Sequence, residues 1–310
     1  NQISKKFNLY DFPDNSRKIH KEKVSLLGGF LFFSCFTIYF IFYISNSIEV
    51  FFTFREFVSL FIVTSIFFFI GLYDDKFNLR PDTKLYLMLF LSACLILFNN
   101  DFVIRELNFS FYHKTILLGN FSVLFSVICI LCFVNACNMF DGIDLQFGFY
   151  LILLSIIFIG KGMMSNFHYC TIICAICFLF YNHKKKIFIG NSGTLFLGSL
   201  FSFLFIGSYT KANLFTADEI FLIMSVPGFD MIRVSILRLI QGKHMFQPDN
   251  LHMHHFLIKK LGLFKTNFLI QLSIIFPLLI FYIYQNFLVC LTISTTGYLS
   301  LFIYAKKITK

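Results

Sequence analysis

The stretch "ILLGNFSVLFSVICILCFVNACNMFDGIDLQFG" (116–148) decides the fold, because an apolar run of membrane-spanning length ends in a polar cluster. The apolar part covers 116–134, and a helix needs about 20 such residues to cross a bilayer. The polar cluster that follows contains Asn135, Asn138, Asp141 and Asp144. Residues three apart are neighbours on a helix, and ionisable residues at membrane depth predict a functional site.

Apolar runs of similar kind recur along the 310 residues, which are 57% hydrophobic and only 14% charged. Soluble domains carry about 25% charged residues. We expect spans at 26–45, 57–73, 85–98, 116–134, 147–160, 168–180, 194–208, 220–236, 267–284 and 287–304. The runs are continuous rather than alternating, which excludes a barrel. The sequence therefore predicts an all-α polytopic membrane protein, one domain over 1–310 with about ten transmembrane helices.

The basic residues predict the orientation of these spans. With residues 1–25 inside, 21 of the 26 Lys and Arg side chains lie on the cytoplasmic side, as the positive-inside rule requires. Both ends of the chain and a His-containing loop at 238–265 are then cytoplasmic, and the location is the inner or plasma membrane. This topology explains the net charge of +10 without nucleic acid. Residues 1–25 show no signal-peptide pattern, and nearly all nine cysteines lie in apolar runs, as buried hydrophobes do.

Two adjacent carboxylates, Asp74 and Asp75, follow the second run in "GLYDDKFNLRPDTK" (71–84). Neighbouring carboxylates raise each other's pKa unless a cation intervenes. Mg²⁺ would relieve this repulsion and would also bind a substrate phosphate. The alternative is a solvated helix end, paired with Lys76 or Arg80.

Three further stretches fall on the same face. "GNSG" (190–193) indicates a helix N-terminus whose amides receive a phosphate. "HMHH" (252–255) places His252 and His255 three apart on one helical face, with His254 pointing elsewhere, and leaves zinc, phosphate binding and proton transfer open. Arg233 and Arg238 suit a pyrophosphate, or anchor the chain at the membrane surface.

These residues together indicate a membrane-embedded site with acids for a metal, basic groups for phosphate and a bilayer on its flank. A transferase acting on a phosphorylated lipid fits this combination. A transporter or channel would show internal repeats and polar groups near mid-membrane, and the sequence shows neither.

Five ordered stretches resemble the polyprenyl-phosphate N-acetylhexosamine-1-phosphate transferase family, which is glycosyl transferase family 4. They are "DNSRKIHKEKVSLLGG" (14–29), "DDKFNLRP" (74–81), "NACNMFDGID" (135–144), "GNSGTLFLG" (190–198) and "FQPDNLHMHHFL" (246–257). The last is similar to the motif of the undecaprenyl-phosphate GlcNAc-1-phosphate transferase-like branch. That branch serves O-antigen, teichoic acid and related cell-wall and lipopolysaccharide polymers.

The resemblance implies transfer of HexNAc-1-phosphate, with GlcNAc-1-phosphate expected first, from a UDP-sugar to undecaprenyl phosphate, releasing UMP. It implies Mg²⁺, with Mn²⁺ as an alternative, and leaves a homodimer open. The implied catalytic residues are Asp74, Asp75, Asp141, Asp144, His252, His254 and His255. The implied substrate-binding residues are Asn135, Asn138, Arg233, Arg238 and Lys84, and the implied metal ligands are Asp141, Asp144 and Asn191.

Three departures from the family pattern stand out. Asn191 occupies the position of a metal-binding Asp, and a neutral amide oxygen is the weaker Mg²⁺ ligand. Leu145 and Gln146 replace the Gly-Leu that usually follows the second Asp of the Asp-Gly-x-Asp motif. The family's first helix is expected to be missing, because the chain starts at the basic segment that normally follows it. The first two departures favour a second hypothesis, a catalytically weakened paralogue that binds nucleotide sugar or lipid phosphate.

Overall fold

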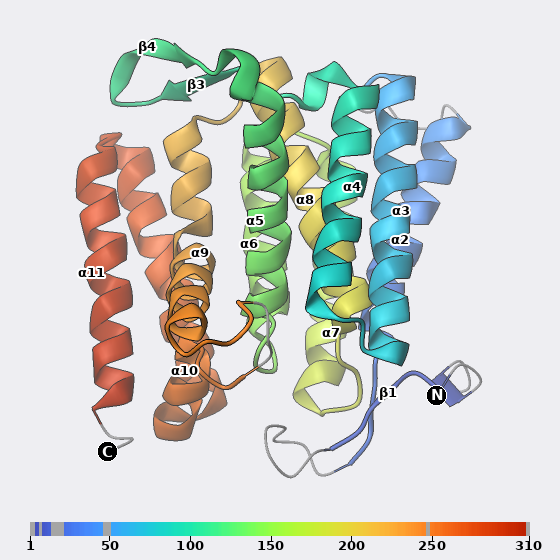
Figure 1. Cartoon of the computed structure of the whole chain (residues 1–310), viewed down its shortest axis with the longest axis vertical. Coiled ribbons are helices and arrows are strands. Elements are labelled where there is room, and N and C mark those ends of the chain that lie inside the picture. The colour runs from blue at the N-terminus through green and yellow to red at the C-terminus, as the bar shows by residue number, and fades with distance from the viewer. Residues whose placement is uncertain (1–3, 6–7, 14–21, 46–50, 246–248, 308–310) are drawn as a thin grey trace.

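The computed structural model describes residues 4–5, 8–13, 22–45, 51–245 and 249–307. Within these ranges ten α-helices run largely side by side along the long axis of the molecule (Figure 1). They are α2 (Gly28–Ile44), α3 (Phe54–Phe77), α4 (Pro81–Phe98), α5 (Ser122–Phe140), α6 (Gln146–Gly160), α7 (Ser165–His183), α8 (Gly190–Ala212), α9 (Ala217–Ile240), α10 (Met253–Tyr284) and α11 (Phe287–Lys306). Seven are long and apolar enough to cross a membrane: α3, α4, α5, α8, α9, α10 and α11. The predicted all-α polytopic membrane fold is confirmed.

Two short hairpins mark the opposite ends of the helix bundle (Figure 1). Strands β1 (Tyr10–Asp11) and β2 (Val24–Ser25) pair at the end where both chain termini lie. Strands β3 (Glu106–Phe109) and β4 (Tyr112–Leu117) pair at the other end. The predicted span at 116–134 therefore begins too early. Ile116 pairs with Leu107 in the hairpin, the 3₁₀ turn η2 (Gly119–Phe121) follows, and the helix starts at Ser122.

Helix α8 lies at the centre of the bundle, and 94% of its most apolar 18-residue stretch is buried. It packs against α2, α3 and α5. Small residues along α8 allow this, because membrane helices gain their packing energy from close backbone approach rather than from a hydrophobic driving force. A Cβ on Gly29 of α2, for example, would lie 2.5 Å from the amide nitrogen of Gly193. The beginning of α8 is thus held rigidly between its neighbours.

The contact between α3 and α8 leads to a stability prediction. A Cβ on Gly71 would overlap the backbone of Asn191 and Ser192, so Gly71→Ala must push the two helices apart. We expect a loss of about 1–3 kcal/mol in the free energy of unfolding, measured by thermal unfolding in detergent. Gly297→Ala is the control, because a Cβ there meets nothing within 4 Å. Equal stability of the two variants would contradict this close packing.

Several polar motifs are more helical than predicted. Helix α3 continues through Asp74 and Asp75, and α8 begins at Gly190, so that Asn191 lies in its first turn. The His-containing loop predicted at 238–265 is shorter, because α9 extends to Ile240 and α10 starts at Met253. Gly262, with φ of 74° and ψ of 175°, then kinks α10. Residues 14–21 of the basic N-terminal motif and 246–248 of the His-containing motif lie outside the described residues.

Candidate active site

A cavity of about 650 Å³ brings the predicted residues together. Twelve of the thirteen predicted site residues line it, from five separate segments of the chain. They are Asp74, Asp75, Lys84, Asn135, Asn138, Asp141, Asp144, Asn191, Arg238, His252, His254 and His255. The helix ends and loops that carry most of them lie at the end of the bundle where both chain termini are found (Figure 1). Apolar side chains of α4, Leu85 and Met88, complete one part of the lining.

The carboxylates of Asp74 and Asp75 point to different partners. Asp74 accepts hydrogen bonds from the backbone of Leu79 (2.8 Å) and from Lys84 Nζ (2.9 Å). Asp75 accepts from the backbone amides of Asn191 (2.7 Å) and Ser192 (3.0 Å). The sequence predicted that a metal ion or the basic residues Lys76 and Arg80 would relieve their repulsion. Lys84, rather than Lys76 or Arg80, neutralises Asp74, and Asp75 caps the N-terminus of α8, where amides and the helix dipole favour an anion.

Lys84 also connects this acidic pair to the position that departs from the family pattern. Its Nζ donates a second hydrogen bond to Asn191 Oδ1 at 3.2 Å. The amide oxygen of Asn191 therefore lies beside a cation that is shared with Asp74. Asn191 stays in the cavity lining, but its oxygen is neutral and already accepts a hydrogen bond.

The second acidic pair lies on the turn between α5 and α6. Asn135 and Asn138 are on the last turns of α5, and Asn138 Oδ1 accepts from Thr194 Oγ1 at 2.7 Å. Asp141 is the C-cap of α5, and Asp144 follows in the turn, so the predicted common helical face holds only for the two asparagines. Burial, reinforced by the Asp144 and Asp75 carboxylates, raises the pKa of Asp141 to about 8.

The backbone conformation at Leu145 is one that favours glycine, which is the residue of the family pattern at this position. Leu145 adopts φ of 71°, in the left-handed region that costs an ordinary residue about 1–2 kcal/mol. The turn is held by side chains from other helices. Asn182 of α7 accepts from the Leu145 amide at 2.6 Å, and Asn267 of α10 donates to the carbonyl of Asp144 at 3.0 Å. These contacts fix the Asp141–Asp144 turn without the glycine.

The three histidines form one cluster of rings at the start of α10. The rings of His252 and His254 are parallel with centroids 5.3 Å apart, and the centroids of His254 and His255 are 4.4 Å apart. The prediction that His254 points elsewhere is wrong. Its Nε2 is buried, has no hydrogen-bond partner among the described residues, and faces Gly142, between the two acids of the turn. An unpaired buried nitrogen costs free energy, and His254 lies in the cavity lining, where this nitrogen is available to a bound group.

The contact between Gly142 and His254 gives a second prediction. A Cβ on Gly142 would overlap the His254 ring. We expect Gly142→Ala to displace the ring and to lower the activity of the site at least 10-fold, because a misplacement of about 1 Å in a site costs up to 10²-fold. Gly228→Ala, on α9 with nothing within 4 Å of the new Cβ, is the control. Activity in detergent extracts at matched expression measures the effect, and equal activity of both variants would contradict the geometry.

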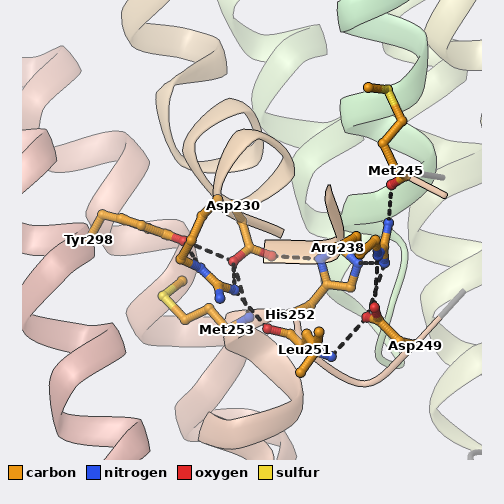
Figure 2. A network of polar contacts seen from close by, with 9 residues as sticks. Asp230, Arg238, Met245, Asp249, Leu251, His252, Met253 and Tyr298 are labelled. Atoms are coloured by element: carbon orange, nitrogen blue, oxygen red, sulfur yellow. Dashed lines mark hydrogen bonds and ion pairs between the residues drawn. The ribbon is translucent and has the colours of Figure 1, made fainter. Parts of the chain in front are cut away.

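The two arginines separate into different roles. Arg238 lines the cavity although only 2% of its surface is exposed. It donates to both oxygens of Asp249 (2.7 and 3.0 Å) and to the carbonyl of Met245 (2.7 Å), as Figure 2 shows. Burial raises the pKa of Asp249, but these bonds outweigh it and the net pKa is below the ordinary value.

Arg233 is not among the residues that line the cavity. Its guanidinium donates to Asp230, to the carbonyl of Leu251 and to the hydroxyl of Tyr298, each at 2.7 Å. The expectation that Arg233 binds substrate gains no support from this position. These three hydrogen bonds from the guanidinium connect the His-containing loop, through Leu251, to Tyr298 of α11.

The donor set of the cavity fits a hard divalent cation. Six aspartates line it against three basic side chains, Lys84, Lys185 and Arg238. Carboxylate and amide oxygens are the ligands that Mg²⁺ prefers. In the described part of the chain, no three His, Cys, Asp or Glu side chains converge closely enough to hold a metal by themselves. A cation here would need oxygens from a substrate or from water to complete its coordination.

Sequence reasoning missed several residues of the site. Lys185 lines the cavity, but it belongs to a basic run, Lys184 to Lys186, of the kind that anchors a chain at the membrane surface. Asp249 stood inside the recognised His-containing motif, and its pairing with Arg238 had no local signal. Asp230 lies in the middle of the sequence of α9, and only the tertiary fold places it against His252 (2.7 Å).

A cavity that combines acids, basic side chains and an apolar flank in a helical membrane bundle is typical of membrane transferases for phosphorylated substrates. A family model described as glycosyl transferase family 4 matches residues 57–209. A probable undecaprenyl-phosphate N-acetylglucosaminyl 1-phosphate transferase of Bacillus subtilis is 29% identical over 310 residues, covering 97% of this chain and 82% of that protein.

Two further relatives carry the name undecaprenyl-phosphate alpha-N-acetylglucosaminyl 1-phosphate transferase. The protein of Escherichia coli strain K12 is 24% identical over 274 residues, covering 83% of this chain and 71% of its own length. That of Yersinia pestis is 25% identical over 277 residues, covering 83% and 72%. Over residues 57–209 the chain matches glycosyl transferase family 4, and its similarity to these relatives indicates an enzyme of the phosphotransferase type.

Proposed function

We propose that the protein transfers N-acetylhexosamine 1-phosphate, with GlcNAc-1-phosphate as the first candidate, from its UDP-sugar to undecaprenyl phosphate and releases UMP. The reaction would take place at the cytoplasmic face of the plasma membrane, as the first membrane step of a cell-envelope glycan. One observation carries the proposal. A single cavity in a membrane bundle combines carboxylates, basic side chains and an apolar wall with a buried histidine nitrogen that has no hydrogen-bond partner in the described part of the chain.

The chemistry requires one bond to form and one to break. An oxygen of the lipid phosphate attacks the β-phosphorus of the nucleotide sugar, and the bond from this phosphorus to the bridging oxygen of UMP breaks. Arg238, Lys84 and Lys185 line the cavity and would attract the phosphates. His254, whose Nε2 faces the Asp141–Asp144 turn, would donate to or accept from a substrate group there. Asn135 and Asn138 offer amide groups to the sugar or the base.

The roles of Asp74 and Asp75 differ from those of a free general base. Lys84 holds the first, and the amides of α8 hold the second. We therefore assign Asp75 the task of fixing α8, and Asp74 that of placing Lys84 beside the phosphates. The lipid phosphate is itself ionised near neutral pH and needs no base of high strength to attack.

Mg²⁺, or Mn²⁺, would be held by Asp141 and Asp144, with Asn191 as a neutral third oxygen, and would supply charge neutralisation for the phosphates. Two anionic substrates would bring further negative charge to the turn that carries Asp141 and Asp144, so such neutralisation would favour their binding. Leu145 and the neighbouring residues keep the turn that carries both acids in place.

A weakened paralogue that only binds these substrates is the second candidate, and Asn191 is the observation that favours it. The experiment is transfer of labelled sugar phosphate to undecaprenyl phosphate by purified protein, with Mg²⁺, Mn²⁺ or EDTA and with several UDP-HexNAc donors. EDTA-sensitive lipid product from the wild type supports the enzyme, and Asn191→Asp should then lower the Mg²⁺ concentration for half-maximal rate. An inactive wild type with an active Asn191→Asp would establish the paralogue instead.

A further inference from the structure

A buried network of hydrogen bonds connects Tyr298 of α11, through Asp230, to His252 in the cavity lining (Figure 2). Asp230 and Tyr298 themselves do not line the cavity. At its centre is Asp230 of α9, which is 6% exposed. Its Oδ2 lies 2.7 Å from His252 Nδ1. Its Oδ1 accepts from Arg233 (2.7 Å), from the Tyr298 hydroxyl (2.9 Å) and from the Met253 amide (3.1 Å). Four donors around one carboxylate fix its position and orientation.

The donors and acceptors of this network determine the tautomer of His252. Asp230 is an acceptor, so His252 carries its hydrogen on Nδ1. Arg238 can only donate, and its NH2 lies 3.3 Å from His252 Nε2, so that nitrogen presents its lone pair. Both ring nitrogens are thus engaged within the protein. His252 therefore links Asp230 to Arg238 rather than acting on a substrate.

His254 and Arg238 are the groups that this arrangement places in the cavity. The His254 ring stacks on His252 with an interplanar angle of 2°. Arg238 is held by His252 on one side and by Asp249 on the other. A rotated or differently protonated His252 ring would therefore disturb both groups at once.

We propose that Asp230 and Tyr298 are positioning residues of the transfer reaction, which hold His252 as the Nδ1–H tautomer so that Arg238 and His254 face the substrate phosphates. The inference rests on the proposed function. Tyr298 is 4% exposed and belongs to α11, where it also accepts from Arg233 Nε at 2.7 Å. The last helix of the described chain thus takes part in the site through one hydroxyl group.

Two variants and one control test this assignment. Asp230→Asn keeps the shape but can turn a donor toward His252, and we expect kcat/KM to fall about 10–100-fold, as for other residues that orient a ligand. Tyr298→Phe removes one hydrogen bond and should lower kcat/KM about 3–10-fold, mainly through KM for the UDP-sugar. Ser294→Ala is the control. It removes the Ser294–Ser225 hydrogen bond (2.8 Å) between the same helices, about one turn further from the histidines, and should leave kcat/KM within about 2-fold.

A spectroscopic measurement distinguishes a residue that sets the tautomer of His252 from one that only stabilises the fold. The ring ¹⁵N chemical shifts of ¹⁵N-histidine-labelled protein, with His252 assigned through His252→Gln, should show the Nδ1–H tautomer in the wild type. Asp230→Asn should move the ring toward the Nε2–H tautomer. If that variant does not fold, Tyr298→Phe against Ser294→Ala decides. An Nε2–H tautomer in the wild type, or equal kcat/KM for Tyr298→Phe and Ser294→Ala, would overturn the inference.

The failure of the proposed function is distinguishable from the failure of this inference. A wild type that transfers no sugar phosphate with any donor contradicts the function, whereas the ¹⁵N measurement needs no substrate and still reports whether Asp230 sets the tautomer of His252.

Discussion

Asp141→Asn is expected to abolish nearly all transfer, lowering kcat/KM about 10³-fold, which corresponds to about 4 kcal/mol of transition-state stabilisation. Asparagine has the same shape but no charge, so the cavity loses one of the two acids on the Asp141–Asp144 turn and with it a ligand for the cation. Burial raises the pKa of this carboxyl group to about 8, so its ionised form is disfavoured in the folded protein. The thermal midpoint of unfolding should therefore stay constant or rise while activity falls.

Asp82→Asn is the matched control for this variant. Asp82 lies on α4 at the same end of the bundle, but its side chain is 50% exposed and pairs with His244 at 2.7 Å. It does not line the cavity. Activity within about 2-fold of the wild type is expected, since exposed ion pairs contribute little. Asp141→Asn with more than a tenth of wild-type activity would contradict the role of Asp141.

Arg238→Lys is expected to lower kcat/KM about 10²-fold, mainly through KM for the nucleotide sugar. Lysine keeps the charge, but its compact ammonium cannot reproduce the planar fork that binds both oxygens of Asp249 while it contacts Met245 and His252. The loss of three or four hydrogen bonds at a side chain that is almost completely buried takes the guanidinium partner away from Asp249 and from His252 Nε2. Initial rates over a range of UDP-sugar concentrations separate KM from kcat.

Arg105→Lys is the comparison for Arg238→Lys. Arg105 is exposed and lies beside the hairpin of β3 and β4, at the opposite end of the bundle from the cavity. Its replacement should change neither constant. If Arg238→Lys behaves like Arg105→Lys, the fork geometry of Arg238 has no part in substrate binding.

The ten helices of the described residues could be predicted from the sequence, because each contains an apolar run, and seven of them are long and apolar enough to cross a membrane. Their ends were less predictable. The apolar residues Ile116 and Leu117 looked like the start of a span, yet they form strand β4, since a backbone pairing with β3 was available. The sequence did not predict that α3 extends through Asp74 and Asp75, because two charges end the apolar run there. In the fold, Lys84 and the α8 amides bind these carboxylates.

The members of the site were predictable and their geometry was not. Composition and order pointed to the aspartates, asparagines and histidines, and twelve of the thirteen side chains line one cavity. Spacing alone pointed His254 away from the site. That prediction assumed one helix through all three histidines, whereas α10 begins at Met253 and His252 precedes it as the N-cap. The neutralisation of Asp74 by Lys84 and the link from Tyr298 to His252 depend on contacts between distant segments, which no local pattern records.

The most direct measurement follows a β-³²P label from UDP-GlcNAc in the presence of undecaprenyl phosphate, Mg²⁺ and purified protein. The account predicts that the label and the sugar enter the lipid together and that unlabelled UMP appears in equal amount. Sugar-bearing lipid without label, accompanied by labelled UDP, would show that a different bond breaks. Either that result or the absence of any lipid product, with every UDP-HexNAc donor and with Asn191→Asp as well, would contradict the proposed phosphotransfer.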